Sequence, residues 1–244
     1  MPINHITGNA IMGKQMISQF ASCGFMLEIL YSFVIIVCSL MIYFGTKELY
    51  ELSSHKGIKY FRLSFLFFAI AYFFRSFIKF VVIYFNIESI FNFSPKTFGI
   101  LFGSATMFVF MYFSAMAIFY LLYSVMWKKL EKSPNKIYLF HFFAFIISLI
   151  TIIFMNPFVY LWMNLLLLSC VIFIYYLSRK QSKVKKSKHN LHIIYTLLFS
   201  FWVLNIIDIL IPTFFKTFQL FIYLASIFLF LLMLYKVIKK TGAN

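Results

Sequence analysis

The sequence has few charged residues and very few acidic ones. Only 11% of its 244 residues are charged, and Asp and Glu together number six. A soluble domain has roughly a quarter of its residues charged. With 63% hydrophobic residues, the chain has too little polar surface to coat a soluble core, so the composition excludes a soluble globular protein. Because six acidic residues leave little for general acid–base chemistry, we predict that the chain is not an enzyme.

Cysteine is scarce too, and catalytic and cofactor motifs are missing. The three cysteines, Cys23, Cys38 and Cys170, lie in or beside apolar runs and lack metal-binding spacing. His189 and His192 have no third ligand close in the sequence. The sequence contains no phosphate loop, no H-E-x-x-H motif and no nucleophile elbow. We therefore predict no cofactor, no metal site and no catalytic residue.

The charge that is present is mostly positive, with a formal net charge of +16. In a soluble protein this would suggest nucleic acid as a partner. Here the basic residues lie between apolar runs, so anionic lipid headgroups explain them better, and we predict no nucleic-acid partner. Six basic residues fall in the segment 179–190. This segment is either a topology determinant that also holds anionic lipid or a contact surface for a cytoplasmic partner.

Long apolar runs fill most of the sequence. A membrane-spanning helix needs about 20 mostly apolar residues. Seven stretches qualify, at 25–45, 58–85, 98–126, 137–155, 158–178, 191–211 and 218–237. The break at Asn156-Pro157 is the least obvious one, but proline disfavours helix at the preceding residue and lacks an amide donor. The sequence predicts an all-α polytopic membrane protein with a seven-helix transmembrane domain over 25–240.

The basic residues are divided unequally between the two sides of the predicted membrane. Alternate loops and the C-terminus hold 17 of the 22 Lys and Arg residues, and the opposite side holds three. Because cytoplasmic loops carry the excess of Lys and Arg, the N-terminus should be outside and the C-terminus in the cytoplasm. We expect a multi-pass protein of the cell membrane. Residues 1–24 are too polar to span, and are expected to form an extracellular segment, either an interfacial helix or a floppy tail.

Two cations interrupt the second apolar run, "AIAYFFRSFIKFVVIYF" at 69–85. At 1.5 Å per residue from the cytoplasmic start, Arg75 lies about 26 Å along this helix and Lys79 about 32 Å. Asp208 lies about 25 Å along the sixth helix. All three therefore fall in the outer part of the membrane. Ionisable groups inside a span are costly, usually face the bundle interior, and mark a site or a pathway.

Several polar side chains are expected to share this outer layer: Glu28, Arg75, Lys79, Asn164, Asn205 and Asp208. Similar depth and opposite charge predict an ion pair between Arg75 and Asp208. This pair is either a structural brace between two helices or the centre of a polar pocket open to the outside. Lys79 alternatively snorkels to the interface, and Glu28 alternatively lies among the headgroups. Asn164 alternatively serves as an interhelical hydrogen-bond donor.

The segment "GILFG" at 99–103 is a G-x-x-x-G pattern in an apolar helix. Thr106, Ser114 and Ala117 extend the same small face. Since small residues let helices approach closely, we expect this face to pack inside the bundle, with dimerisation as the alternative.

Seven helices with an outside N-terminus are similar in topology to rhodopsins and G-protein-coupled receptors. Opsins attach retinal to a lysine in the middle of their seventh helix. The seventh helix predicted here, "FQLFIYLASIFLFLLMLY" at 218–235, contains no lysine, so retinal attachment is disfavoured. The receptor patterns CWxP and NPxxY are also missing from the sequence. The stretch "ELYELSSHKGIKYFRLSFLFFAIAYFFRSF" at 48–77 resembles uncharacterised archaeal membrane proteins. That resemblance implies a seven-helix family and no particular function.

These observations predict a sensor or receptor-like membrane protein. It would bind a small anionic or zwitterionic ligand in an outward-facing pocket lined by the polar layer. The alternative is a small transporter in which an Arg75–Asp208 pair gates the pathway. A transporter should have polar residues along its whole axis. The cytoplasmic half offers mainly Ser, Thr and His141, which favours a closed inner end.

Overall fold

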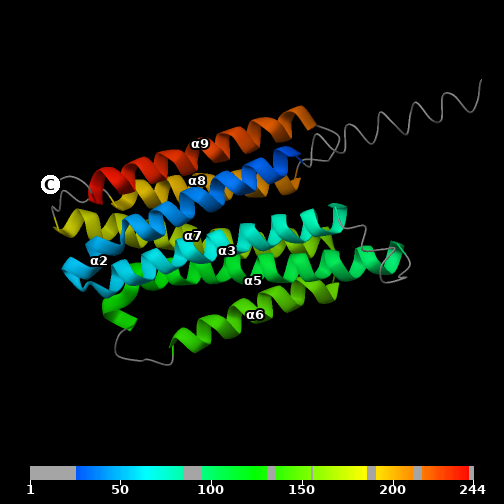
Figure 1. Cartoon of the computed structure of the whole chain (residues 1–244). Helices are drawn as coiled ribbons and strands as arrows, with labels where there is room; N and C mark the ends of the chain where they lie inside the picture. Colours follow the sequence, from blue (N-terminus) through cyan, green and yellow to red (C-terminus); the bar gives the residue numbers. More distant parts are fainter. Residues whose placement is uncertain are drawn as a thin grey trace, which may run out of the picture.

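The structure, a computed structural model, describes residues 26–84, 95–130, 136–154, 156–185, 191–210 and 216–241 (Figure 1). Over these ranges the chain is helical and contains no strand. Seven of the described helices are long and apolar enough to cross a membrane. The predicted all-α, seven-helix fold is therefore confirmed. The side of the membrane that each end faces stays a prediction, and the segment 1–24 lies outside the described residues.

The first helix, residues 26–45, is called the N-terminal helix below. After it come α2 (Lys47–Ser53), α3 (Lys56–Tyr84), α5 (Pro95–Leu130), α6 (Lys136–Phe154), α7 (Pro157–Lys185), α8 (Leu191–Leu210) and α9 (Lys216–Thr241). The N-terminal helix and α2 together form one apolar span, Met26–Ser53. This span ends at Ser54, which adopts the left-handed conformation with φ 50° and reverses the chain into α3.

The break between α6 and α7 forms as its sequence predicts. Asn156 stands directly before Pro157, the first residue of α7. Its side-chain Oδ1 accepts a hydrogen bond of 2.9 Å from the amide of Phe158, and its carbonyl accepts one of 3.0 Å from the amide of Tyr160. Asparagine as N-cap and proline as first helical residue are both favoured at a helix start.

Two helices extend further than the apolar pattern predicts. Helix α5 has 36 residues, about 54 Å at 1.5 Å per residue, against about 30 Å of hydrocarbon in a bilayer. Helix α7 continues to Lys185, into the polybasic segment. The apolar windows end earlier, at Lys128 and Lys180. Both helices therefore continue past the end of their apolar run, because lysine and arginine are good helix formers.

Large apolar side chains fill the core of the bundle and also cover its outer surface. The inner ones have under 2% of their surface exposed and include Phe65, Phe68, Phe201 and Phe230. The outer ones include Phe44, Phe142 and Phe228, with 62%, 58% and 61% exposed. A water-exposed protein surface does not carry such side chains on every face, whereas lipid solvates them. The burial pattern is that of a bundle in a membrane.

Each helix packs against particular neighbours (Figure 1). Helix α3 lies along α5, and α5 also contacts α6 and α7. Helix α8 contacts α7 and α9. The N-terminal helix touches α3 and α9 through Tyr31, whose ring lies 5.7 Å from that of Tyr72 and 4.7 Å from that of Tyr223. The N-terminal helix, α3 and α9 therefore meet around one group of tyrosines.

One end of the bundle gathers α2, the start of α3 and the end of α9, and is called the basic end below (Figure 1). Close packing there depends on Gly57. The hydroxyl of Ser124 on α5 donates a hydrogen bond of 2.8 Å to the Gly57 carbonyl. A Cβ at position 57 would stand 2.8 Å from Cε1 of His55 and 2.9 Å from Cδ1 of Trp127. Glycine thus lets α3 and α5 approach.

The small face predicted on α5 is only partly buried. Ser114 and Ala117 are buried as expected, with 1% and 0% exposed. Gly103 is exposed, and a Cβ there would meet nothing within 4 Å. The expectation that this glycine packs inside the bundle is wrong. Gly103 shares a face with Ser114 but lies about three turns nearer the helix start, where the other helices leave it uncovered.

Candidate functional site

The polar residues predicted for the outer layer lie on four helices. Glu28 is on the N-terminal helix, Arg75 on α3, Asn164 on α7, and Asn205 and Asp208 on α8. Lys79 belongs to α3, but its side chain is outside the part of the chain that the structure describes.

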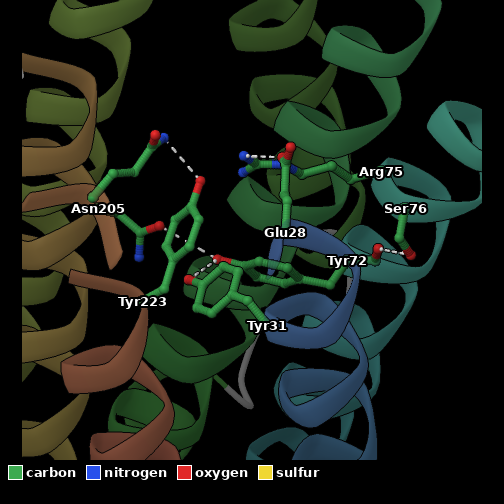
Figure 2. Close-up of polar contacts among 8 residues, drawn as sticks. Glu28, Tyr31, Tyr72, Arg75, Ser76, Asn205 and Tyr223 are labelled. Carbon is green, nitrogen blue, oxygen red and sulfur yellow. Dashed lines mark hydrogen bonds and ion pairs between the residues drawn. The ribbon is translucent and has the colours of Figure 1, made fainter. Parts of the chain in front are cut away.

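The centre of the site is an ion pair between Glu28 and Arg75 (Figure 2). Nη2 of Arg75 lies 2.8 Å and Nε 3.1 Å from the same carboxylate oxygen, Oε1 of Glu28. The side chains are only 21% and 18% exposed, and the guanidinium carbon lies 5.0 Å from the centre of the Phe110 ring. Two charge-assisted hydrogen bonds, together with a cation–π contact, hold this guanidinium in an aromatic environment.

The predicted salt bridge between Arg75 and Asp208 is wrong, because Arg75 pairs with Glu28 instead. Depth along a helix does not say which helices are neighbours. The N-terminal helix and α3 are joined through α2 and pack as an antiparallel pair, as consecutive elements commonly do. Glu28 thereby reaches Arg75 from the adjacent helix.

A second link lies one turn away from the ion pair (Figure 2). The hydroxyl of Tyr72 donates a hydrogen bond of 3.3 Å to Oδ1 of Asn205 on α8. The hydroxyls of Tyr31 and Tyr72 are also 3.3 Å apart. Since Tyr72 uses its only hydrogen on Asn205, Tyr31 is the donor in that second bond. The chain Tyr31–Tyr72–Asn205 ties the N-terminal helix to α3 and α8.

Helix α9 joins the site through Tyr223. Its ring stacks on Tyr31 at 4.7 Å, and its hydroxyl accepts a hydrogen bond of 3.0 Å from Nε2 of Gln219. Asp208 lies within electrostatic range of Tyr223 and of Tyr31. Asp208 is therefore part of the same polar region, although it is not the carboxylate that holds Arg75.

Asn164 belongs to a different set of contacts. It is 4% exposed, and its Nδ2 donates to the Tyr160 carbonyl of its own helix at 2.8 Å and faces Sδ of Met111 on α5 at 4.0 Å. Nε1 of Trp202 on α8 donates to the Asn164 backbone carbonyl at 3.4 Å. Asn164 thus joins α7 to α5 and α8, the alternative role that its sequence position allowed.

The sequence did not single out Tyr31 and Tyr72, because 16 tyrosines and 36 phenylalanines hide any one aromatic residue. A usable signal was present all the same. Tyr31 follows Glu28 by three residues, and Tyr72 precedes Arg75 by three. Residues three apart share a helix face, and in antiparallel helices these two spacings place the tyrosines opposite each other once the ion pair forms.

Another polar cluster joins α5 and α6. Tyr112 and Tyr120 of α5 lie about two turns apart, with His141 of α6 between them. The Tyr112 hydroxyl is 2.8 Å from Nδ1 of His141, and the Tyr120 hydroxyl is 3.5 Å from Nε2. Both ring nitrogens therefore have a hydroxyl partner. Within the described ranges, no three His, Cys, Asp or Glu residues gather closely enough to hold a metal ion.

We expect His141→Leu to lower the free energy of unfolding by about 1–2 kcal/mol, because it strands the Tyr112 hydroxyl in an apolar interface. Thermal unfolding of the purified protein in detergent measures the effect. Tyr112→Phe should cost more than Tyr120→Phe, since the first removes a bond of 2.8 Å and the second one of 3.5 Å. If neither tyrosine variant lowers the free energy of unfolding, the cluster does not stabilise the contact between α5 and α6.

The chain is similar to an archaeal protein. An uncharacterized protein of Archaeoglobus fulgidus is 28% identical over 217 residues, covering 87% of this chain and 92% of that protein. No family model and no solved structure matches the chain. The archaeal resemblance predicted from 48–77 thus extends over most of the chain and fits an archaeal seven-helix membrane protein. The likeness to rhodopsins stays a prediction.

Proposed function

We propose that this multi-pass membrane protein is a receptor-like binder of a small zwitterionic or anionic ligand, which docks at the Glu28–Arg75 ion pair. The observation that carries the proposal is the pair itself. A pair of charges, each about one-fifth exposed, lies within a layer of tyrosine and phenylalanine side chains. Ionisable groups inside a membrane span are costly to keep and by default indicate a functional site.

The chemistry of the pair favours a ligand that carries a carboxylate or phosphate. Arg75 gives two N–H groups to Glu28, and its remaining N–H groups make no hydrogen bond to the residues that the structure describes. Guanidinium presents its donors as a planar fork that matches carboxylate and phosphate oxygens. A zwitterion fits best, because its cationic group can face Glu28 while its anionic group faces Arg75.

The tyrosine chain supports a sensor over a passive binder. Glu28 and Tyr31 share one helix face, and Arg75 and Tyr72 share another. A ligand that separates Glu28 from Arg75 would therefore also strain the Tyr31–Tyr72 contact and the Tyr72–Asn205 bond. The displacement would reach α8, and through the Tyr31–Tyr223 stack it would reach α9.

We also propose that the protein lies in the cell membrane with its N-terminus outside and its basic end against anionic lipid headgroups. The support is the unequal distribution of Lys and Arg, which would leave the Glu28–Arg75 pair in the outer half of the membrane. A transporter is the second candidate. Its support is the Glu28–Arg75 pair, because ionisable groups inside a span also mark transport pathways, and this pair would be its gate.

The test compares whole zwitterions with their halves. We expect the free amino acid alanine, added as a ligand, to raise the thermal unfolding temperature of the purified protein. Propionate, which carries only the carboxylate, and ethylamine, which carries only the amine, should raise it less. Arg75→Gln should abolish the shift. Arg62→Gln should keep it, since Arg62 lies at the basic end, where Nε donates to the Tyr43 carbonyl at 3.0 Å. The proposal fails if the unfolding temperature of the wild-type protein is unchanged by amino acids, by carboxylates and by inorganic phosphate.

A further inference from the structure

Arg62 of α3 is held from several directions at the basic end. Its Nε donates a hydrogen bond of 3.0 Å to the carbonyl of Tyr43, near the end of the N-terminal helix. Its guanidinium carbon lies 4.8 Å from the centre of the Tyr43 ring and 5.8 Å from that of Tyr50 on α2. Because guanidinium stacks on aromatic faces, the two rings and the carbonyl together fix the position of this cation.

Two lysines at the same end of the bundle are held less firmly. Nζ of Lys128 lies 5.7 Å from the centre of the Trp127 ring, and Nζ of Lys239 lies 5.9 Å from that of Tyr235. Each lysine contacts one ring of its own helix, and neither makes a hydrogen bond within the described ranges. That is what snorkelling to the membrane surface requires. Arg62, in contrast, is fastened to two neighbouring helices.

The guanidinium of Arg62 keeps unused donors. Nη1 and Nη2 make no hydrogen bond and no salt bridge to any side chain or carbonyl in the described helices. Arg62, Tyr43 and Tyr50 are each partly exposed, so a group on the outer surface of the bundle can approach them. The free end of the guanidinium is a planar fork that matches two oxygens of one phosphate or carboxylate.

Further positive charge flanks this fork. Lys59 precedes Arg62 by three residues and shares its helix face, and Lys47 follows Tyr43 by four residues. Both lysines are exposed. Lys47 lies 3.7 Å from Glu51, with both side chains about 60% exposed, and such a surface pair is weak. The charge complementary to this surface is that of an anion.

The depth of Arg62 matches that of lipid phosphates. It lies six residues into α3, about 9 Å from the start of the apolar span at Lys56. Side chains of a helix tilt toward its N-terminus, which for α3 is the basic end, so Arg62 reaches back toward the headgroup layer. In the other direction the same face continues as Leu66 and Phe73, and Phe73 is 47% exposed. Apolar surface thus lies directly next to the cation.

We propose that Arg62, held by Tyr43 and Tyr50, is a specific site for the phosphate of an anionic membrane phospholipid. Nη1 and Nη2 donate to two phosphate oxygens, and the acyl chains lie along the face that carries Leu66 and Phe73. Basic surfaces between spanning helices recognise lipid headgroups in this way.

The site deepens the proposed contact between the basic end and anionic headgroups, on which it rests, by assigning one lipid to one guanidinium. It does not depend on ligand binding at the Glu28–Arg75 pair, or on which leaflet the basic end faces.

Native mass spectrometry of the purified protein in detergent, titrated with phosphatidylglycerol, tests the site. Wild type should retain one lipid molecule more tightly than the next. Arg62→Gln should weaken this first binding step by about tenfold or more, because it removes two hydrogen bonds to a charged group. Arg62→Lys should weaken it severalfold, since ammonium keeps the charge and loses the fork. Lys128→Gln is the matched control, because it removes one exposed charge at the same end, and it should change the affinity by less than about twofold.

Two partial ligands identify the occupant. Diacylglycerol has the acyl chains without the phosphate, and glycerol 3-phosphate has the phosphate without the chains. Both should bind far more weakly than phosphatidylglycerol, and binding of either one as tight as that of the whole lipid overturns the assignment.

The variants supply the other decisive outcomes. Equal losses in Arg62→Gln and Lys128→Gln overturn the site, since net charge alone would then hold the lipid, although the general contact with headgroups would stand. Unchanged affinity in Arg62→Lys overturns it even where Arg62→Gln does not fold. Arg75→Gln should bind the lipid as wild type does. Loss of lipid in that variant, with none in Arg62→Gln, would move the lipid to the ion pair and overturn the proposal.

Discussion

Replacing Arg75 by leucine alone is expected to lower the free energy of unfolding by about 3 kcal/mol. The substitution takes the guanidinium away from the Glu28 carboxylate, whose side chain is only 18% exposed. Breaking a buried pair by removing one partner typically costs about 3–5 kcal/mol, and the remaining exposure of this pair argues for the lower end. The cation–π contact with Phe110 is lost as well.

Removing both charges should restore most of the loss. Arg75→Leu combined with Glu28→Leu removes both members of the pair, and apolar replacements of a buried pair are often neutral. Asp208 provides the matched control, because it lies in the same polar region but does not hold Arg75. Arg75→Leu with Asp208→Leu should be no more stable than Arg75→Leu alone.

Denaturant or thermal unfolding of the purified variants in one detergent measures the two double-mutant cycles. A coupling energy near 3 kcal/mol is expected for Glu28 with Arg75, and a value near zero for Asp208 with Arg75. The reverse order would mean that Asp208 is the true partner. If the Glu28–Arg75 double variant is stable and still binds amino acids, the pair is only a brace and the proposed binding site is wrong.

The seven spans were predictable because lipid imposes a simple requirement on the sequence. Every backbone polar group must be satisfied within the membrane, so a run of about 20 apolar residues has to become a helix. The short break at Pro157 was predictable for a similar reason, since proline supplies no amide donor. Helix α2 and the end of α7 were not predictable, because hydropathy does not indicate where a helix continues beyond its apolar run.

The partner of Arg75 was not predictable from depth. Residue counting fixes the height of a side chain along its helix, and by height Glu28, Asn164 and Asp208 were equally suitable neighbours of Arg75. Which of them faces the guanidinium depends on helix adjacency and on rotation about each axis. Sequential connection of the first two spans through α2 was the available hint.

The tyrosines of the site escaped prediction for a different reason. Aromatic residues make up 23% of the chain, so composition gives no contrast around Tyr31, Tyr72 or Tyr223. Only their spacing from Glu28 and Arg75 distinguishes them, and that spacing acquires meaning when the two helices are known to pair.

The orientation of the bundle predicts an all-or-none labelling result. With the native cysteines at 23, 38 and 170 replaced by alanine, a cysteine introduced by Ser94→Cys should react with a membrane-impermeant maleimide in intact cells. One introduced by Ser182→Cys should react only after the membrane is permeabilised. The reason is the excess of Lys and Arg in the loops on the side of position 182, which holds that side in the cytoplasm. Labelling at 182 and not at 94 in intact cells would invert the topology. The Glu28–Arg75 pair would then lie in the inner half of the membrane, and its ligand would have to be sought among cytoplasmic solutes.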